Sequence, residues 1–546
     1  MKFLLKIVLW LLAISLLLYT VIIAIVEPLI ANKIEAALNE KSKEYILEIR
    51  GVDILFFSPG IELKRITLTS KKESGLHGEI RSVKAMRVNL KALYNNDIDI
   101  EELRISNGSL YGNLSSSTEE KKDPEEELPS LSPVSFRIGK LYFDKLNLTI
   151  QDTASSLAYS VKEGFLKIFD IQATKQDTLS LGIIGQVELE AAELFLVSAD
   201  SLHTFSANGL SYSTATLSLK NFSIKPNYTN HDFTARFNYE TDRIEATGSN
   251  TFIYGFSVAA FIRSGTIVSS YVEIGKMDMK VFRDKRKEFK HVKKPTFQDM
   301  IYNYPHFLRI DSIGLINGNV TYTEHAEGAN EAGYISFNDI HAKIYKITND
   351  TFYKTEKAFI ELKSDALLMG KGQLNILFKA QIFEPQNTFS VTGDLAAMDA
   401  NELNPILEKN GFVYATGGKI DAMNFSFTAN NTKSSGTLTM LYHGLDITIK
   451  NKQTDDTTSV KERFISMIAN KFVINSNPLP GNEVRKGIIE YERDPEKFLF
   501  NYCVKSILSG IKTSVTNVKG KAERQADKAD KKADKKAKEN SKKGKE

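Results

Sequence analysis

Alternation of apolar and polar residues with a period of two runs through most of the chain and constrains its fold more than any other feature. In FLRIDSIGLINGNVTYTE, residues 307–324, the alternation runs to a glycine, breaks, and resumes. Successive side chains of a β-strand point to opposite faces, so this period predicts strands with one apolar and one polar face. The chain is therefore predicted to be mainly β, and its apolar face must be covered by something.

We expect a long curved antiparallel sheet that forms an elongated groove, accompanied by a few short helices. About 20 strands at ~4.8 Å per strand would extend roughly 95 Å. Residues 98–113, 136–152 and 308–324 share one form: an alternating strand, a short break and a second strand. Asn107-Gly108 and Asn317-Gly318 predict tight turns at two of these breaks.

Changes in pattern divide the chain into five segments. We expect an anchor helix with its extension, a first β region, a basic irregular connector, a second β region with capping helices, and a disordered basic tail: residues 1–45, 46–282, 283–306, 307–518 and 519–546. Residues 114–133, which are acidic and contain proline, predict a flexible loop. The tail holds twelve Lys or Arg and six Asp or Glu, so the rest of the chain carries −2 of the total charge of +4.

The first residues predict a transmembrane helix. Residues 7–26 are apolar except for Ser15, Tyr19 and Thr20, and about 20 helical residues cross the ~30 Å hydrocarbon layer. Flanking lysines predict a cytoplasmic N-terminus and an exported body. A cleaved signal peptide is the alternative, but it needs a shorter apolar core and small residues before the cut. The residues that carry the anchor prediction are Lys2, Lys6, Trp10, Leu17, Tyr19 and Ile23.

Three helices are predicted near the C-terminus. Asp399 with Glu402, and Ser459 with Glu462, have the spacing of a capping box. The last helix is predicted to start with Asp494 as its cap and Pro495 in its first turn. Its apolar stripe, typical of a core helix or a lid on a sheet, comprises Phe500, Val504, Ile507, Leu508, Ile511 and Val515.

No motif for chemistry is present in the sequence. The eight histidines are scattered, and no zinc, nucleotide or nucleophile-elbow signature occurs. Cys503 is the one cysteine, and we expect it to be a buried core thiol. The small net charge gives no case for binding nucleic acid. We therefore predict a protein that is not an enzyme and has no cofactor or metal; a hydrolase built from dispersed residues ranks last.

Two phenylalanine-rich stretches are candidates for the lining of the groove. Both alternate in the style of strands, and an apolar groove face could hold lipid acyl chains. The same side chains could equally form an ordinary core. The candidate lining residues are Phe233, Phe237, Phe252, Phe256, Val258 and Phe261. The basic connector is expected to be a solvated loop, with contact to anionic headgroups as the alternative.

The order of these patterns resembles the AsmA-like family of bacterial envelope proteins, relatives of TamB. The resemblance rests on the anchor followed by GVDILFFSPGIELKRITLTS, and on YPHFLRIDSIGLINGNVTYTEH, FSVTGDLAAMDANELNPIL and RDPEKFLFNYCVKSILSGIK in the second half. It implies a single-pass inner-membrane protein with its body in the periplasm as a curved β groove, and larger relatives are thought to conduct phospholipids. The present chain is short beside the TamB-like members.

Two functions follow from these expectations. The first is to bind or passively conduct phospholipid acyl chains for outer-membrane biogenesis or homeostasis, with the inner membrane and phospholipid as partners. The second is a scaffold for assembling outer-membrane proteins, in which an exposed strand edge accepts a strand of the partner.

Overall fold

The computed structural model describes the β regions and their short helices. Within them, no helix is long and apolar enough to cross a membrane. The expected anchor (residues 1–26, with Lys2, Lys6, Trp10, Leu17, Tyr19 and Ile23), the loop at 115–135, the Ser459–Glu462 box and the tail from 519 lie outside the described residues. The residues that the structure describes are 27–41, 44–55, 58–72, 75–95, 97–114, 136–152, 157–173, 187–354, 358–411, 413–449, 476–479 and 483–516.

The described residues contain twenty-one strands, which pair into one sheet that does not close. Among the described strands, the first pairs only with the second, and the last only with the one before it. This confirms a mainly β fold with one long sheet and few short helices. The chain forms two compact units, residues 1–227 with 249–265 (unit 1) and residues 228–248 with 266–546 (unit 2).

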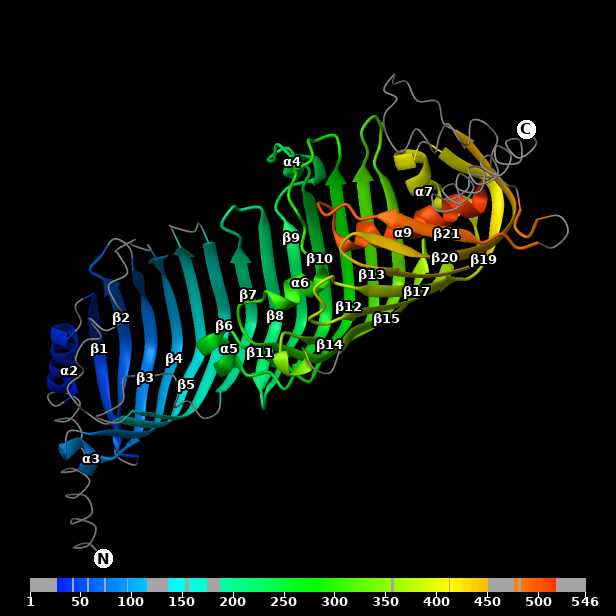
Figure 1. Ribbon diagram of the computed structural model, residues 1–546. Coiled ribbons are helices and arrows are strands. Elements are labelled where there is room, and N and C mark those ends of the chain that lie inside the picture. The colour runs from blue at the N-terminus through cyan, green and yellow to red at the C-terminus, as the bar shows by residue number, and fades with distance from the viewer. Residues whose placement is uncertain are drawn as a thin grey trace, which may run out of the picture. The chain divides into compact units, whose positions relative to one another are not determined.

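Unit 1 contains nine strands that follow the chain order from β1 to β9 (Figure 1, blue to teal). Its elements are α2 (Glu27–Lys41), β1 (Tyr45–Leu55), β2 (Gly60–Ser70), β3 (Leu76–Val88), α3 (Leu90–Tyr94), β4 (Ile98–Leu114), β5 (Phe136–Asp152), β6 (Leu157–Ala173), β7 (Val187–Val197), β8 (His203–Ser213), β9 (Thr216–Pro226) and α5 (Val258–Ser264). Strand β10 (Asp242–Tyr254) contributes to both units.

Unit 2 contains the remaining strands and the C-terminal helix. Its elements are α4 (Asn230–Thr234), β11 (Ile267–Ser269), β12 (Tyr271–Asp284), α6 (Phe297–Tyr302), β13 (Leu308–His325), β14 (Gly333–Thr348), η3 (Thr351–Lys354), β15 (Phe359–Leu368), β16 (Gly372–Gln381), β17 (Phe389–Leu395), β18 (Met398–Asp399), η4 (Ala400–Leu403), α7 (Asn404–Ile406), η5 (Leu407–Gly411), β19 (Val413–Ala429), β20 (Lys433–Ile449), β21 (Gly487–Glu492) and α9 (Leu499–Val515).

Pairing is not antiparallel throughout, which corrects the expectation. Strands β4 and β5 are parallel, and β13 is parallel to both β11 and β12. To form a parallel neighbour, the chain must run back from the end of the first strand to the level where that strand began, and this connection takes a dozen or more residues. The segments expected to be an acidic loop and a basic connector lie between β4 and β5 and between β12 and β13, and both have this length.

The two Asn-Gly pairs do not form turns. Strand β4 continues through Asn107-Gly108, and β13 continues through Asn317-Gly318 with shifts of register. In β4 the backbone at Asn107 is left-handed, with φ of 54°. The expected strand-turn-strand repeats are therefore single long strands with an irregularity in the middle.

These irregularities align across unit 1 into one line, which we call the crease. Left-handed residues at this level are Arg65, Asn107, Lys145, Glu163 and Gly209, with φ between 48° and 61°. The ladders between neighbouring strands are interrupted at the same level from β1–β2 to β8–β9. A left-handed residue turns the strand sharply, because its dihedral angles lie far from those of extended backbone. The strands that carry these residues, β2, β4, β5, β6 and β8, therefore bend at the crease.

The apolar face of unit 2 is a packed core rather than an open groove. Side chains from β16, β17, β19, β20 and β21 that are at most 4% exposed include Ala380, Phe389, Val391, Leu395, Phe425, Phe427, Leu438, Met440, Tyr442 and Ile489. Helix α9 lies on this core (Figure 1, red), and the Tyr502 ring is 5.8 Å from that of Phe389. The apolar face of this part of the chain is therefore covered by the protein's own elements.

Helix α9 begins and packs differently from its prediction. Its first residue is Leu499, and Asp494 instead accepts a hydrogen bond from the Glu496 backbone. Its buried residues are Tyr502, Ser506, Gly510, Ser514 and Val515. Of the predicted stripe, Val515 is buried and Ile507 and Ile511 pack on the core, whereas Phe500 and Leu508 are exposed. Small residues allow the helix backbone to approach the sheet closely. The predicted helical segment after Asp399 is confirmed, but the Asp399 side chain makes no capping bond.

The basic connector is more ordered than expected. Arg283 and Asp284 still belong to β12, and Thr296 and Asp299 form a capping box at the start of α6. Three of its cations are in ion pairs: Arg283 with Asp242, Lys285 with Glu324, and Arg286 with Asp284.

Candidate functional site

An apolar face extends over all nine strands of unit 1. Residues paired directly across neighbouring strands share a face of the sheet. One such row runs Val52, Leu63, Val83, Ile105, Phe143, Leu166, Leu189, Tyr212 and Leu217. A second, on the other side of the crease, runs Leu47, Leu68, Gly78, Leu110, Leu148, Val161, Leu194, Ala207 and Phe222. We call the surface formed by these two rows the apolar face of unit 1.

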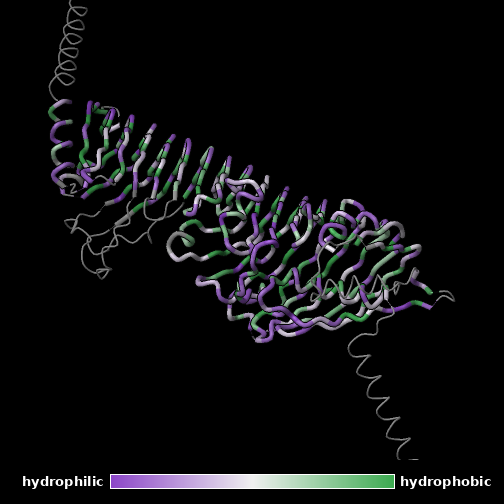
Figure 2. Tube along the Cα trace, turned by 90° about the horizontal axis from the view of Figure 1, so that it is seen from above, coloured by the Kyte–Doolittle hydropathy of each residue, from purple (hydrophilic) through white to green (hydrophobic). Residues whose placement is uncertain are grey.

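The length of this face exceeds that of a small ligand. Eight steps between neighbouring strands at ~4.8 Å give a row of roughly 38 Å. Neither row contains a charged residue. Figure 2 shows hydrophobic and hydrophilic segments alternating along these strands, as expected for two faces of opposite character.

Most of the apolar face is only half-buried. Ala31 and Ile34 of α2 pack on Ile49, Val52 and their neighbours, at the first strands. From β3 to β9 the row residues are half-buried, apart from Gly78 and Tyr212, which are buried. Within the described part of unit 1, α2 is the helix that contributes to a buried apolar cluster on this face. The face thus differs from the core of unit 2, where the corresponding side chains are fully covered.

The opposite face of unit 1 is polar and charged. Lys162 pairs with Glu193 across β6 and β7, and the Lys167 Nζ lies 3.0 Å from a carboxylate oxygen of Glu188. Hydroxyl pairs such as Ser206 with Ser223 link β8 and β9. Unit 1 therefore presents one water-compatible surface and one surface that excludes charge.

The six predicted lining residues do not lie together on this face. Phe233 is on α4 and is 1% exposed, so it is a core residue whose ring contacts that of Phe237. Phe252 is on β10, stacked on Tyr254. Phe256 precedes α5, which carries Val258 and Phe261. Both phenylalanine-rich stretches contain short helices where strands were expected.

The apolar face is marked in the sequence by a change in the spacing of apolar residues, from two positions to three. In β2, apolar residues at 61 and 63 are followed by 66 and 68, a gap of three in place of two. The left-handed Arg65 absorbs the extra residue, so all four side chains remain on one face. The same gap between Ile105 and Gly108 accompanies Asn107 in β4.

Helix α2 covers the open edge of β1. The backbone N–H of Leu47 donates to Asn39 Oδ1, and Asn39 Nδ2 donates to the Leu47 carbonyl, both at 2.7 Å. The backbone N–H groups of Ile49 and Ile54 donate to Glu35 and Glu27. Side chains of the helix thus occupy the positions that a further strand would use.

Helix α9 covers the edge of β21 in the same way. The Ile488 N–H donates to Thr513 Oγ1 at 2.7 Å, and the Glu490 N–H donates to Ser509 Oγ at 3.1 Å. Thr513 in turn donates to the Ile488 carbonyl. The strands at the two ends of the sheet are therefore both capped by helices.

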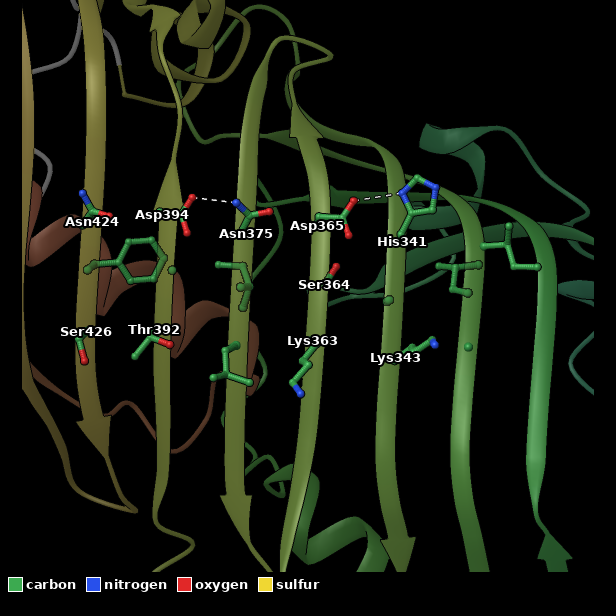
Figure 3. Close-up of a pocket in the computed structure, with 18 of the residues that line it drawn as sticks. His341, Lys343, Lys363, Ser364, Asp365, Asn375, Thr392, Asp394, Asn424 and Ser426 are labelled. Carbon is green, nitrogen blue, oxygen red and sulfur yellow. Dashed lines mark hydrogen bonds and ion pairs between the residues drawn. The ribbon is translucent and has the colours of Figure 1, made fainter.

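Unit 2 also has an open groove of about 830 Å³, on its polar face. Directly paired residues from β14 to β19 form its central row: His341, Asp365, Asn375, Asp394 and Asn424. Figure 3 shows this row, with His341 bonded to Asp365 and Asn375 bonded to Asp394. Ser364 pairs with Ala342 and Ile376 in a different row. The arrangement is a ladder of hydrogen-bonding groups, and it does not assemble a Ser-His-Asp set.

Among the described residues, no group of three or more His, Cys, Asp or Glu is placed to hold a metal ion. Comparisons with protein-family models, with curated proteins and with solved structures gave no match.

Proposed function

We propose that this chain is a membrane-anchored envelope protein that binds phospholipid acyl chains on the apolar face of unit 1 and lets them move along it. The observation that carries the proposal is a charge-free face over nine strands that is only half-buried. A soluble protein normally covers an apolar face of this length with another layer. A bound acyl chain would cover the apolar face in place of such a layer, and it could exchange with another acyl chain.

The energetics favour a ligand held by its hydrocarbon. Removing one CH₂ group from water contributes about 0.8 kcal/mol. Because no charged group on the two rows fixes a position, neighbouring registers along the face have similar free energies. Passive sliding then needs no nucleotide site, and the polar opposite face keeps the protein soluble while the lipid is bound.

The location in the cell is part of the proposal. Residues 1–26 have the length and apolarity of a single membrane span, and α2 begins at the next residue, Glu27. The AsmA-like resemblance supports the inner membrane for the anchor and the periplasm for the body. In this arrangement the first strands of unit 1 lie near the membrane from which lipid is drawn.

Lipid retained by the purified chain tests the proposal. We expect mass spectrometry of the protein to detect bound phospholipid, and Leu148→Asp combined with Leu194→Asp to reduce it at least ten-fold. Each substitution places a carboxylate on the apolar face, where the desolvation of a charge opposes binding. Circular dichroism should show an unchanged content of β structure.

The matched control is Thr149→Asp, an exposed position on the same strand but on the polar face. This variant should retain as much lipid as the unmodified chain. Equal retention by Leu148→Asp/Leu194→Asp and Thr149→Asp would refute binding on the apolar face.

Binding of a partner strand at a sheet edge, the second expected function, gains no support from the geometry. Both end strands donate their outward N–H groups to side chains of α2 or α9. A partner strand would have to displace these helices first.

A further inference from the structure

Two adjacent rows of side chains cross the polar face of unit 2 and line its open groove. Each row takes one residue from each neighbouring strand, and the members of a row are direct partners in the sheet. Partners in a row are ~4.8 Å apart, and the two rows are separated by two residues, or ~6.6 Å, along each strand. From β14 to β20, the first row is His341, Asp365, Asn375, Asp394, Asn424 and Thr439, and the second is Lys343, Lys363, Leu377, Thr392, Ser426 and Thr437.

The groove lies on the face of the sheet that α9 does not cover. Phe425 and its partner Leu438 are buried in the core, and a Cβ atom on Gly510 of α9 would lie 2.9 Å from Leu438 Cβ. Side chains alternate between the two faces of a strand, so Asn424 and Ser426 point to the opposite face. Both are exposed, and Figure 3 looks onto the polar side chains of this face.

The groove presents hydrogen-bonding groups that the fold itself does not use. Within the described part of the chain, four of its side chains make no hydrogen bond to another residue: Thr392, Asn424, Ser426 and Thr437. Asn375 donates through Nδ2 to Asp394 at 2.8 Å, and its carbonyl oxygen can still accept. Hydroxyl and amide groups can both donate and accept hydrogen bonds. The groove therefore suits a ligand that offers donors and acceptors at many points along its length.

The charges in the groove balance. Besides His341, its titratable lining consists of two lysines, Lys343 and Lys363, two aspartates, Asp365 and Asp394, and Tyr271. The Lys363 Nζ also lies 2.8 Å from a carboxylate oxygen of the neighbouring Glu361. A strongly charged ligand, such as a nucleic acid, gains little attraction from a surface of balanced charge. The balance favours a neutral ligand.

One end of the groove is apolar. Gly314 of β13 is the partner of Lys343 and extends the second row by one strand. A Cβ atom at this glycine would lie 3.2 Å from the ring carbons Cε2 and Cζ of Tyr271, so the tyrosine ring occupies the space that the glycine leaves. Ile316, which is 49% exposed, lies two residues further along β13. An aromatic ring beside polar rows suits a ligand that has both hydroxyl groups and an apolar C–H face.

We propose that this groove binds a neutral, unbranched oligosaccharide that lies across the strands. A pyranose unit carries hydroxyl groups around its edge and C–H groups on its faces, which matches the polar rows and the Tyr271 ring. In an extended chain with β-1,4 linkages, each unit advances by a length close to the ~4.8 Å between strands, so successive units meet equivalent side chains. An extended peptide binds chiefly through backbone groups at a sheet edge, and these strands already use theirs to pair with one another. The site belongs to unit 2 and is independent of acyl-chain binding by unit 1.

Hexasaccharides with β-1,4 linkages of N-acetylglucosamine, mannose and xylose test the site by isothermal titration calorimetry. The full chain is kept in a polyoxyethylene detergent, because a detergent with a sugar headgroup would compete for the groove. At least one hexasaccharide should bind, and the disaccharide of the same sugar should bind at least about ten-fold more weakly because it spans fewer strands. Asn424→Ala/Ser426→Ala should weaken binding of the hexasaccharide about ten-fold, since two hydrogen-bonding side chains are lost. Neither side chain bonds to another described residue, so the fold should be unchanged by circular dichroism.

The matched control is Thr428→Ala, an exposed position on the same strand and face as Ser426 but outside the groove. It should bind the hexasaccharide as tightly as the unmodified chain, and so should Leu148→Asp/Leu194→Asp, which alters only the apolar face of unit 1. The assignment is overturned if none of the hexasaccharides binds, or if Asn424→Ala/Ser426→Ala keeps the full affinity. Equal affinity for a neutral peptide of serine and glycine of the same length would also overturn it.

Discussion

Single residues with left-handed backbone decide how the strands of unit 1 bend. Of the five at the crease, Gly209 adopts this conformation without cost, whereas Arg65, Asn107, Lys145 and Glu163 do so against the steric preference of a side chain. Their conformation keeps the apolar residues before and after the crease on one face. Single left-handed residues therefore keep the apolar face continuous across the bend of each strand that carries one.

Cys503 gives a prediction about pH at the same scale. Burial raises the pKa of its thiol to about 12, from an ordinary value of about 9. Above pH 9 the thiol ionises in the unfolded chain but not in the folded one, so the free energy of unfolding should decrease as pH rises from about 9 toward 12. Urea unfolding at pH 8 and pH 10 should show a larger loss for the unmodified chain than for Cys503→Ala. An identical pH dependence of the unfolding free energy in the two proteins would contradict this role of the Cys503 thiol.

At the scale of elements, helix α2 should protect the β1 edge. Glu35→Ala combined with Asn39→Ala leaves the N–H groups of Leu47 and Ile49 without partners, and we expect a loss of about 2 kcal/mol and concentration-dependent association. Light scattering with denaturant unfolding measures both effects. Glu40→Ala, at an exposed position of the same helix, should change neither. Association of the Glu40→Ala control to the same extent would show that the edge is not involved.

Helix α9 illustrates close packing of an element through small residues. A Cβ atom on Gly510 would lie 2.7 Å from Ile489 Cγ1 and 2.9 Å from Leu438 Cβ. Gly510→Leu should therefore force the helix away from the sheet and cost at least ~2 kcal/mol of unfolding free energy. Leu508→Gln, on the exposed side, should cost less than about 0.5 kcal/mol. Similar losses for both, measured by denaturant unfolding, would mean that the buried side of α9 is misassigned.

For the whole molecule, the two units should respond differently to a neutral lipid. Unit 2 already has a packed core, whereas the apolar face of unit 1 gains its cover from the ligand. Dioctanoylglycerol at about 100 times its Kd should stabilise unit 1 by ~2.7 kcal/mol. Hydrogen exchange should slow in β4–β8 and remain unchanged in β16–β19. Slower exchange confined to β16–β19 would contradict the assignment of the lipid to unit 1.

The sequence by itself determined the mainly β fold, the short helices at the C-terminal end and one apolar face per strand, because these follow from local periodicity. It also contained the crease, as gaps of three in the alternation of β2 and β4. It did not reveal that the phenylalanine-rich stretches contain the helices α4 and α5 where we expected strands, because a short apolar run is compatible with either a helix or a strand.

Only the tertiary structure decided which apolar face is covered. Strands of units 1 and 2 alternate alike, yet α9 and neighbouring elements bury the face of unit 2, while β3 to β9 remain half-buried. Whether a side chain is core or surface depends on what packs against it from far along the chain, and periodicity carries no information about that. The small-residue side of α9 and the capping of both sheet edges likewise depend on how each helix packs on its strands, which the periodicity of a single segment does not specify.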